Sequence, residues 1–434
     1  MKNYRKYLGI FYILAAFIII PIYNKGTFDN LSQHKVEAFY LVNILFFIAY
    51  FVLGIISDIR KKNEDKLKNS TPSKDGASKD AQKTLDIAMG IYIFANFLSL
   101  LFSKNIENAF YGVPGFGMGF LSILLMGISY FYISRNVNLT EPVIHIIALS
   151  SLLPILLTII NRLGYDPFKM FNEGEYIRTH LYVSTIGNYS AFCAYMGIII
   201  PIVCFMTFFA EKKTVRCIYG AFLALDIISI IMAGTSAIRI VTVFAFLLVL
   251  FWKIAPQLHI YQGAIIAVCV LFFLCYALFV SIGISNPDFA NGRGFIWELT
   301  REMFRSFSIK QKMIGVGTNC YMYSLSDFLM KSPKYLEACN ERFGNLALTS
   351  SHSEYLDYLI NSGIIGLFSY GYVIYAALKT YSEMENANKF FRLSFLCIIC
   401  YLLIVTVNFS NVLSTPFFFI FLGTLGYGKR ALDR

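Results

Sequence analysis

Long runs of apolar residues recur along the whole chain, and they constrain its fold more than any other feature. A helix needs about 20 mostly apolar residues to cross the ~30 Å hydrocarbon core of a membrane. Residues of the hydrophobic types make up 57% of the 434 residues and charged residues only 15%, too few to cover a soluble protein of this size. Unbroken runs such as Ile198–Phe209 are not the alternating pattern of a transmembrane barrel. The sequence therefore predicts an all-α, polytopic membrane protein.

The apolar runs predict about twelve transmembrane helices in a single membrane domain, residues 1–434. The expected spans are 8–23, 38–56, 85–102, 113–133, 143–160, 183–209, 217–233, 237–252, 263–283, 355–378, 393–408 and 413–428. Leu8–Ile22 has a basic flank but no small-residue cleavage site, so it is expected to be a span and not a removed signal peptide.

Basic residues predict the orientation of these spans. With the N-terminus inside, 22 of the 37 Lys and Arg residues fall on inner segments and seven on short outer segments. Such residues gather on the cytoplasmic side of membrane proteins. We therefore expect both termini to be cytoplasmic, in the plasma membrane. The net charge of +11 is then a topology and lipid-contact signal, and no nucleic acid partner is expected because no basic face with interleaved aromatic residues lies outside the spans.

Two polar segments interrupt the spans. Residues 57–84 are rich in Lys, Asp and Ser, which predicts a disordered cytoplasmic linker. Residues 284–353, before the tenth span, predict a long extracytoplasmic loop, within which Phe295–Phe307 has the pattern of an amphipathic helix. Cys320 and Cys339 lie in this loop, where they could form a disulfide or remain free. No Cys/His spacing for a metal site is present.

His352 is the main catalytic candidate. Ser351-His352-Ser353-Glu354 reads as a capping box before an apolar run, with Ser351 at the N-cap and His352 in the first helical position. The positive end of a helix disfavours a protonated imidazole and attracts phosphate, so a neutral histidine there could accept a proton near pH 7. A surface histidine near a helix cap is the simpler alternative.

Three arginines on the expected outer side are candidates for binding an anionic ligand. Arg239 begins the eighth span, where an outer arginine opposes the usual charge bias and suits a lipid-linked phosphate. Arg293 lies between glycines in Asn-Gly-Arg-Gly, which lets the backbone approach a ligand, although a plain turn would have the same sequence. Arg178, in the loop before the sixth span, is a weaker candidate. Guanidinium groups match the geometry of phosphate oxygens.

Four stretches in this order resemble the O-antigen ligase and polymerase superfamily of membrane glycosyltransferases. They are Thr185–Tyr195, Gly234–Arg239, Arg293 to Gly317 with Trp297 between, and Ser351–Tyr355 followed by Gly363–Leu367. The resemblance covers about residues 160–380. One departure is Gly-Asn-Tyr-Ser at 187–190, where the family has Gly-Asn-Pro-Asn.

The resemblance implies a donor glycan carried on undecaprenyl pyrophosphate and transfer to a glycan or lipid-glycan acceptor outside the membrane. It implies that Arg239 and Arg293, with Arg178 ranked lower, hold the pyrophosphate. It further implies that His352 activates the acceptor or supports that step, and that no metal or other cofactor is needed. The protein would supply position and charge stabilisation.

Four functions remain open from the sequence. A polymerase would join repeat units on the lipid carrier, and a ligase would move finished glycan to another acceptor. A flippase or transporter would place charges at mid-membrane and show internal repeats, neither of which is apparent. A non-catalytic membrane scaffold is the fourth.

Overall fold

The computed structural model describes residues 4–26, 30–65, 81–171, 182–234, 236–254, 262–283, 286–344, 348–383 and 388–432. These residues are predominantly helical, so the all-α prediction is confirmed. One short antiparallel pair, β1 (Tyr182–Val183) and β2 (Gly187–Asn188), flanks the 3-10 turn Ser184–Ile186 before α8.

The first half of the chain forms α1 (Tyr4–Ile22), α2 (Leu31–Asp65), α3 (Ala81–Leu101), α4 (Ile106–Tyr111), α5 (Phe120–Asn136), α6 (Glu141–Arg162) and α8 (Tyr189–Phe209). The middle forms α9 (Lys213–Ala233), α10 (Ser236–Ile254), α11 (Gln262–Gly283), α12 (Phe289–Ser306), α13 (Ile309–Ile314), α14 (Tyr321–Met330) and α15 (Pro333–Phe343). The last part forms α16 (Glu354–Asn361), α17 (Gly363–Ser382), α18 (Lys389–Ile404) and α19 (Thr415–Leu432).

Among the described residues, seven helices are long and apolar enough to cross a membrane, as a multi-pass membrane protein requires. They are α1, Leu31–Ser57 of α2, Lys83–Leu101 of α3, α6, α8, α9 and α10. Shorter apolar segments lie in α11 (Ile265–Tyr276) and α19 (Thr415–Gly428). The structure therefore supports a helical membrane protein, with seven helices of spanning length and apolarity where the sequence predicts twelve.

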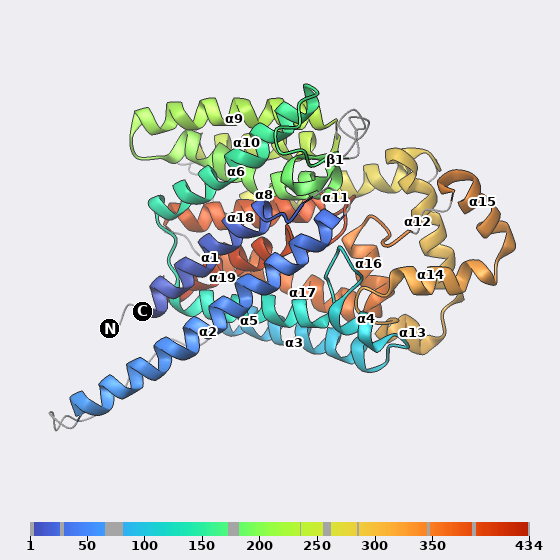
Figure 1. The fold of residues 1–434 in the computed structure, drawn as a ribbon, viewed down its shortest axis with the longest axis horizontal. Coiled ribbons are helices and arrows are strands. Elements are labelled where there is room, and N and C mark those ends of the chain that lie inside the picture. The colour runs from blue at the N-terminus through green and yellow to red at the C-terminus, as the bar shows by residue number, and fades with distance from the viewer. Residues whose placement is uncertain are drawn as a thin grey trace.

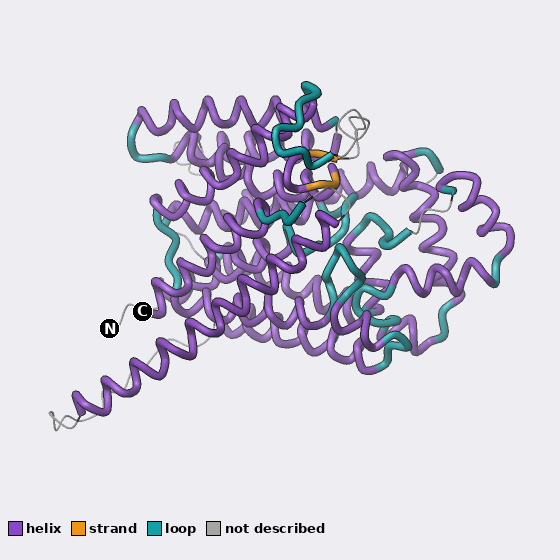
Figure 2. The backbone as a smooth tube through the Cα atoms, in the orientation of Figure 1, coloured by secondary structure: helices purple, strands orange, loops and turns teal. Residues whose placement is uncertain are grey.

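The helices pack side by side into one bundle (Figure 1). Helix α8 lies inside it, in contact with α9, α10 and α18, while α3 packs against α17 and α5. The start of α1 and the end of α19 lie at one end of the bundle, and α12–α15 lie at the other (Figure 1). Many of the loops gather near α12–α15 (Figure 2).

Helices α12–α15, called the cap here, fill most of the segment predicted as a long loop. The amphipathic helix predicted over 295–307 is confirmed, since Ile296, Leu299 and Met303 on its apolar face are buried. On its polar face Arg305 pairs with Glu302 at 2.7 Å, and Arg301 also contacts Glu302, at 3.4 Å. The apolar faces of α12, α14 and α15 enclose a separate core around Leu299.

The two cap cysteines are free thiols in the structure. Cys339 belongs to the core of the cap, whereas Cys320 packs against α3, α4 and α5 in another cluster. Of the two alternatives left open by the sequence, the structure has the unpaired one.

Several predicted boundaries are wrong for identifiable reasons. The glycine-rich start of the span predicted over 113–133 is a loop, because Gly112, Gly115 and Gly117 have positive φ, and the helix begins only at Phe120. The span predicted over 355–378 is broken at Ser362–Gly363. Both ends of the linker predicted over 57–84 are helical, because α2 continues to Asp65 and α3 begins at Ala81, and residues 66–80 lie outside the described residues.

Candidate functional site

A cavity of about 360 Å³ lies where α12 of the cap meets the bundle. It is called the Arg293 cavity here. Its lining residues are Tyr189, Ser190, Cys193, Gly234, Ser236, Ala237, Ile240, Tyr276, Phe289, Ala290, Asn291, Arg293, Ile404, Val407 and Asn408. They come from the starts of α8, α10 and α12, from α11, and from the end of α18 with the loop after it.

Three of the four stretches singled out in the sequence meet at this cavity. Tyr189 and Ser190 belong to the first, Gly234 and Ser236 to the second, and Arg293 to the third. The fourth stretch lies next to it, because Trp297 Nε1 donates a hydrogen bond to the Ser351 carbonyl oxygen at 3.0 Å. Segments separated by more than a hundred residues in sequence thus form one site.

Backbone geometry aims Arg293 into the cavity. Ala290, Asn291 and Gly292 all adopt left-handed conformations, so the chain turns sharply before the regular part of α12 begins. A Cβ atom at Gly294 would lie 2.0 Å from the Asn286 carbonyl oxygen, which makes glycine necessary there. The predicted turn is therefore a tightly wound one that only small residues permit.

The Arg293 guanidinium group has no acidic partner within salt-bridge distance in the described parts of the chain. Asp288, the N-cap residue of the same helix, pairs with Arg342 at 2.7 Å instead. Arg293 Nη2 makes one long contact, 3.5 Å, with Ser190 Oγ. Burial lowers the pKa of Arg293, but guanidinium remains charged at any physiological pH. The cavity therefore has a fixed positive charge that suits an anion.

His352 lies beside Arg293 but in a turn, not in a helix. Its φ is 56°, and its ring packs edge-on against Phe409 with the centroids 5.3 Å apart. Burial, together with the charge of Arg293, lowers the pKa of His352 to about 3. Its Nδ1 atom makes no hydrogen bond with the described residues. The imidazole is therefore neutral, as predicted, but for a different reason and as a much weaker base.

The predicted capping box does not form. Helix α16 begins at Glu354 with Ser353 at the N-cap, so Ser351 and His352 lie outside it. The Ser351 amide and hydroxyl groups both donate to Asp357 Oδ1, at 2.8 and 2.7 Å. Glu354 accepts a hydrogen bond from the Tyr401 hydroxyl group at 2.7 Å instead of reaching back to the N-cap. Asp357 of α16 and Tyr401 of α18 thus replace the reciprocal pairing of Ser351 and Glu354 that the sequence pattern predicted.

Neither of the other two predicted arginines, Arg239 and Arg178, lines the Arg293 cavity among the described residues. Arg239 follows Ser236 and Ala237, which line the cavity, but its own side chain is exposed and donates to the Ile231 carbonyl oxygen at 3.4 Å. Arg178 lies outside the described residues. The structure therefore brings Arg293 and His352 together and leaves Arg239 at the edge of the cavity.

The loop between α18 and α19, residues 405–414, was not predicted to contribute to the site. It is largely buried and borders several cavities at once. Asn408 lines the Arg293 cavity and donates from Nδ2 to the Ser190 carbonyl oxygen at 2.6 Å, while its own carbonyl oxygen accepts from the Glu354 amide at 2.9 Å. Its signal in the sequence is a run of Asn, Ser and Thr between two apolar segments, which resembles an ordinary turn.

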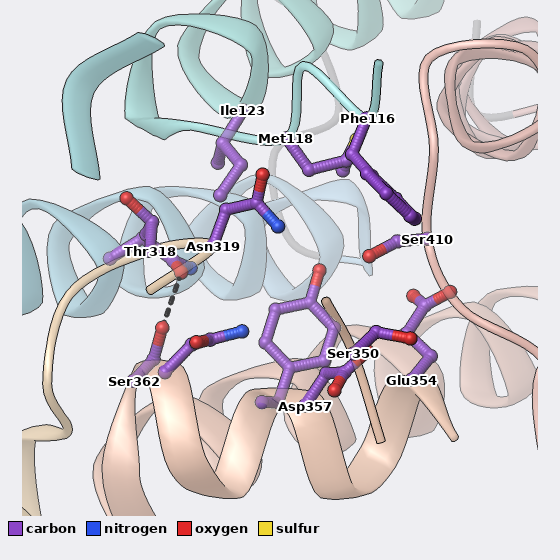
Figure 3. A pocket seen from close by; sticks show the side chains of 13 residues that line it. Phe116, Met118, Ile123, Thr318, Asn319, Ser350, Glu354, Asp357, Ser362 and Ser410 are labelled. Carbon is purple, nitrogen blue, oxygen red and sulfur yellow. Dashed lines mark hydrogen bonds between the residues drawn. The ribbon is translucent and has the colours of Figure 1, made fainter. Parts of the chain in front are cut away.

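A second, polar hollow runs along α16 and is called the α16 groove here. Its lining residues are Asn96, Phe116, Met118, Ile123, Thr318, Asn319, Ser350, Glu354, Asp357, Tyr358, Asn361, Ser362 and Ser410. Figure 3 shows Glu354, Asp357 and Ser362 rising from the helix on one side, with Phe116, Met118 and Ser410 opposite. Ser350 and Glu354, which flank His352 in the sequence, line the groove, and Asn408, whose carbonyl oxygen accepts from the Glu354 amide, lines the Arg293 cavity.

Gly315 and Gly317 have a structural role beside this groove. The Gly317 amide donates to the Asn361 carbonyl oxygen at 3.0 Å, and a Cβ atom at Gly315 would lie 2.2 Å from the same oxygen. These glycines let the cap backbone terminate α16 directly. In the described part of the chain they lie between the helices α13 and α14, and not in the βαβ unit that a dinucleotide-binding fingerprint requires.

The arrangement can hold an anion at Arg293 and present polar groups to a second molecule along α16. Comparison of the sequence with protein-family models and with curated proteins found no match. The chemistry of this site must therefore be argued from its own residues.

Proposed function

We propose that the protein is a membrane glycosyltransferase that transfers or polymerises undecaprenyl-pyrophosphate-linked glycan units on the outer face of the plasma membrane. The observation that carries the proposal is the Arg293 cavity, in which an unpaired, half-buried guanidinium group meets two other stretches that resemble the O-antigen ligase and polymerase superfamily. A fixed cation without a protein counter-ion suits a diphosphate leaving group.

The proposed roles follow from position. Arg293 neutralises the charge that develops on pyrophosphate as the bond to the donor sugar breaks, and Ser190 and Asn408 supply neutral hydrogen-bonding groups beside it. Arg239 is a second contact at the edge of the cavity, reached by a change of side-chain rotamer. His352 supports the step as a neutral group beside Arg293, and Arg178 is a further candidate.

The proposal includes twelve membrane spans with both termini in the cytoplasm. Helices α5 and α18 have 17 and 16 residues, which is short for a span. The loop before α5 (112–119) and the loop after α18 (405–414) can shorten the distance that these helices must cross. The cap then faces outward, which places the Arg293 cavity where a lipid-linked donor presents its pyrophosphate.

Substitution of the central arginine tests this proposal. In a strain that lacks the gene, plasmid-borne Arg293→Ala, Arg239→Ala and His352→Ala should each fail to restore surface glycan while the proteins still insert. Arg305→Ala is the matched control, because Arg305 is an exposed cap arginine on the same helix. Glycan gels provide the measurement, and full glycan from Arg293→Ala would refute the proposal.

The same deletion distinguishes polymerase from ligase. Loss of long chains with single repeat units still attached to their acceptor means polymerase activity. Accumulated carrier-linked polymer with a bare acceptor means ligase activity. Normal glycan in the deletion strain would instead favour a transporter with redundant partners or a scaffold.

A further inference from the structure

We propose that the α16 groove receives the acceptor sugar, and that Glu354 takes the proton from its attacking hydroxyl group. The inference rests on the proposed transferase function and deepens it by assigning a second subsite and a base. It also moves the proton-accepting role from His352, where the sequence resemblance puts it, to the residue two positions later.

The lining of the groove has the chemistry of a sugar site. Carboxylate, amide and hydroxyl groups predominate, and the rings of Phe116 and Tyr358 supply the apolar faces on which a pyranose can lie. The whole groove has only about 20 Å³ of accessible space, enough for a single water molecule or hydroxyl group. A sugar ring would therefore lie at the mouth of the groove and insert one hydroxyl group.

Glu354 is the group that such a hydroxyl would meet. Its side chain is completely buried, and its Oε2 atom accepts from Tyr401. Its Oε1 atom makes no well-formed hydrogen bond with the described residues, although the Tyr370 hydroxyl group lies close by, and none of their basic groups pairs with it. A buried carboxylate oxygen without a partner is costly, so a polar ligand group at this position would relieve that cost.

The surroundings of Glu354 also suit proton transfer near neutral pH. Burial raises the pKa of Glu354 to about 7, against the opposing effects of the Tyr401 and Tyr370 hydroxyl groups. The titratable groups that face it are Asp357, Tyr355 and Tyr358 of α16, Tyr370 of α17, Tyr401 of α18 and Tyr92 of α3. Helix α16 has eight residues and lies before the break at Ser362–Gly363, outside the candidate spans.

His352 is less suited to that role. It lines neither the groove nor the Arg293 cavity, and its neighbour Arg293 disfavours any added positive charge on the ring. The turn that contains it nevertheless joins the two sites, because Glu354 binds the 405–414 loop through its amide while Asn408 of that loop lines the cavity.

The acceptor oxygen forms a bond to the anomeric carbon of the donor sugar, and its proton passes to the Glu354 carboxylate. The bond between that carbon and the pyrophosphate oxygen breaks, and the electron pair leaves with pyrophosphate, whose added charge Arg293 neutralises. The proton then returns to solvent through the open side of the groove.

The test uses right-side-out membrane vesicles from the deletion strain, carrying endogenous lipid-linked glycan and one variant each. We expect Glu354→Gln to reduce the rate of transfer on glycan gels about 100-fold or more, as loss of a general base does. The wild-type rate should fall roughly tenfold per pH unit below about pH 7, and the residual rate of Glu354→Gln should lack this dependence. The matched control is Glu337→Gln, an exposed cap carboxylate that should behave as wild type.

Ser410→Phe provides a second variant in case Glu354→Gln inserts poorly. It fills the groove from the wall opposite α16 and should also abolish transfer without touching the carboxylate. Glu354→Gln within about twofold of wild type, a residual rate with the wild-type pH profile, or an active Ser410→Phe would each overturn the inference. If these variants are active while Arg293→Ala is inactive, only the inference fails; if Arg293→Ala is active as well, the proposed function fails.

Discussion

At the scale of single residues, the environment of each ionisable group decides what it can do. The sequence makes both Arg239 and Arg293 candidates for an anionic ligand, the first between two isoleucines at the start of a span and the second between two glycines. In the structure one is exposed and bonded to a helix-end carbonyl, whereas the other lines a cavity without a counter-ion. Only the second has the unmet charge that an anionic ligand would neutralise.

The lowered pKa of His352 predicts how the stability of the folded protein depends on pH. Its pKa falls from the ordinary 6.5 to about 3 on folding. Between these two pH values the imidazole is protonated in the unfolded chain and neutral in the folded chain. This contribution to stability is full above about pH 6.5 and is lost as the pH falls from there toward about 3. We expect His352→Gln, measured by thermal unfolding in detergent, to weaken the decline of stability between about pH 6.5 and about pH 4. An unchanged decline, or the same weakening in the control His34→Gln, would contradict this.

At the scale of elements, breaks in helices shape the site. The break between α16 and α17 separates the groove from the following apolar helix, and the loop after α18 brings polar groups into the interior. Both breaks place backbone amide and carbonyl groups in the protein interior, which is tolerated where other protein groups satisfy them. The Gly317 amide does so for the Asn361 carbonyl oxygen.

Gly363 is the residue on which the first break depends. Its φ is 69°, and a Cβ atom there would lie 2.4 Å from the Met313 carbonyl oxygen. Gly363→Ala should therefore destabilise the protein by about 2 kcal/mol or more, through left-handed strain and overpacking. Gly371→Ala, in the interior of the same helix with nothing within 4 Å, should stabilise it by up to about 1 kcal/mol. Denaturation in detergent measures both, and equal effects would show that the break does not need glycine.

At the scale of the whole molecule, the arrangement of the bundle bears on its orientation. The described ends of the chain lie together, opposite the cap (Figure 1). The excess of basic residues on the segments expected inside agrees with a cytoplasmic location for these ends. A cap on the outer face would place the Arg293 cavity and the α16 groove outside the cell.

Cysteine labelling in intact cells tests that orientation. A membrane-impermeant maleimide should label Lys331→Cys, an exposed cap position, but not Lys213→Cys, which begins α9 at the end away from the Arg293 cavity. Both variants would be made in a background with the exposed native Cys217 and Cys275 replaced by serine. After the membrane is permeabilised, both positions should react. Labelling of Lys213→Cys in intact cells would invert the proposed topology.

The sequence by itself determined the class of the protein, the turn at Gly234 between α9 and α10, and the amphipathic face of α12. These properties depend only on composition and on the periodicity of neighbouring residues, so they can be predicted without knowledge of distant contacts. Only the tertiary structure decided that Arg293 lines a cavity while Arg239 does not, that Glu354 turns from its capping box to Tyr401, and that Asn408 and Ser410 join the site. Those outcomes depend on which distant segments supply hydrogen-bond partners to a buried polar group, and a local sequence pattern does not contain that information.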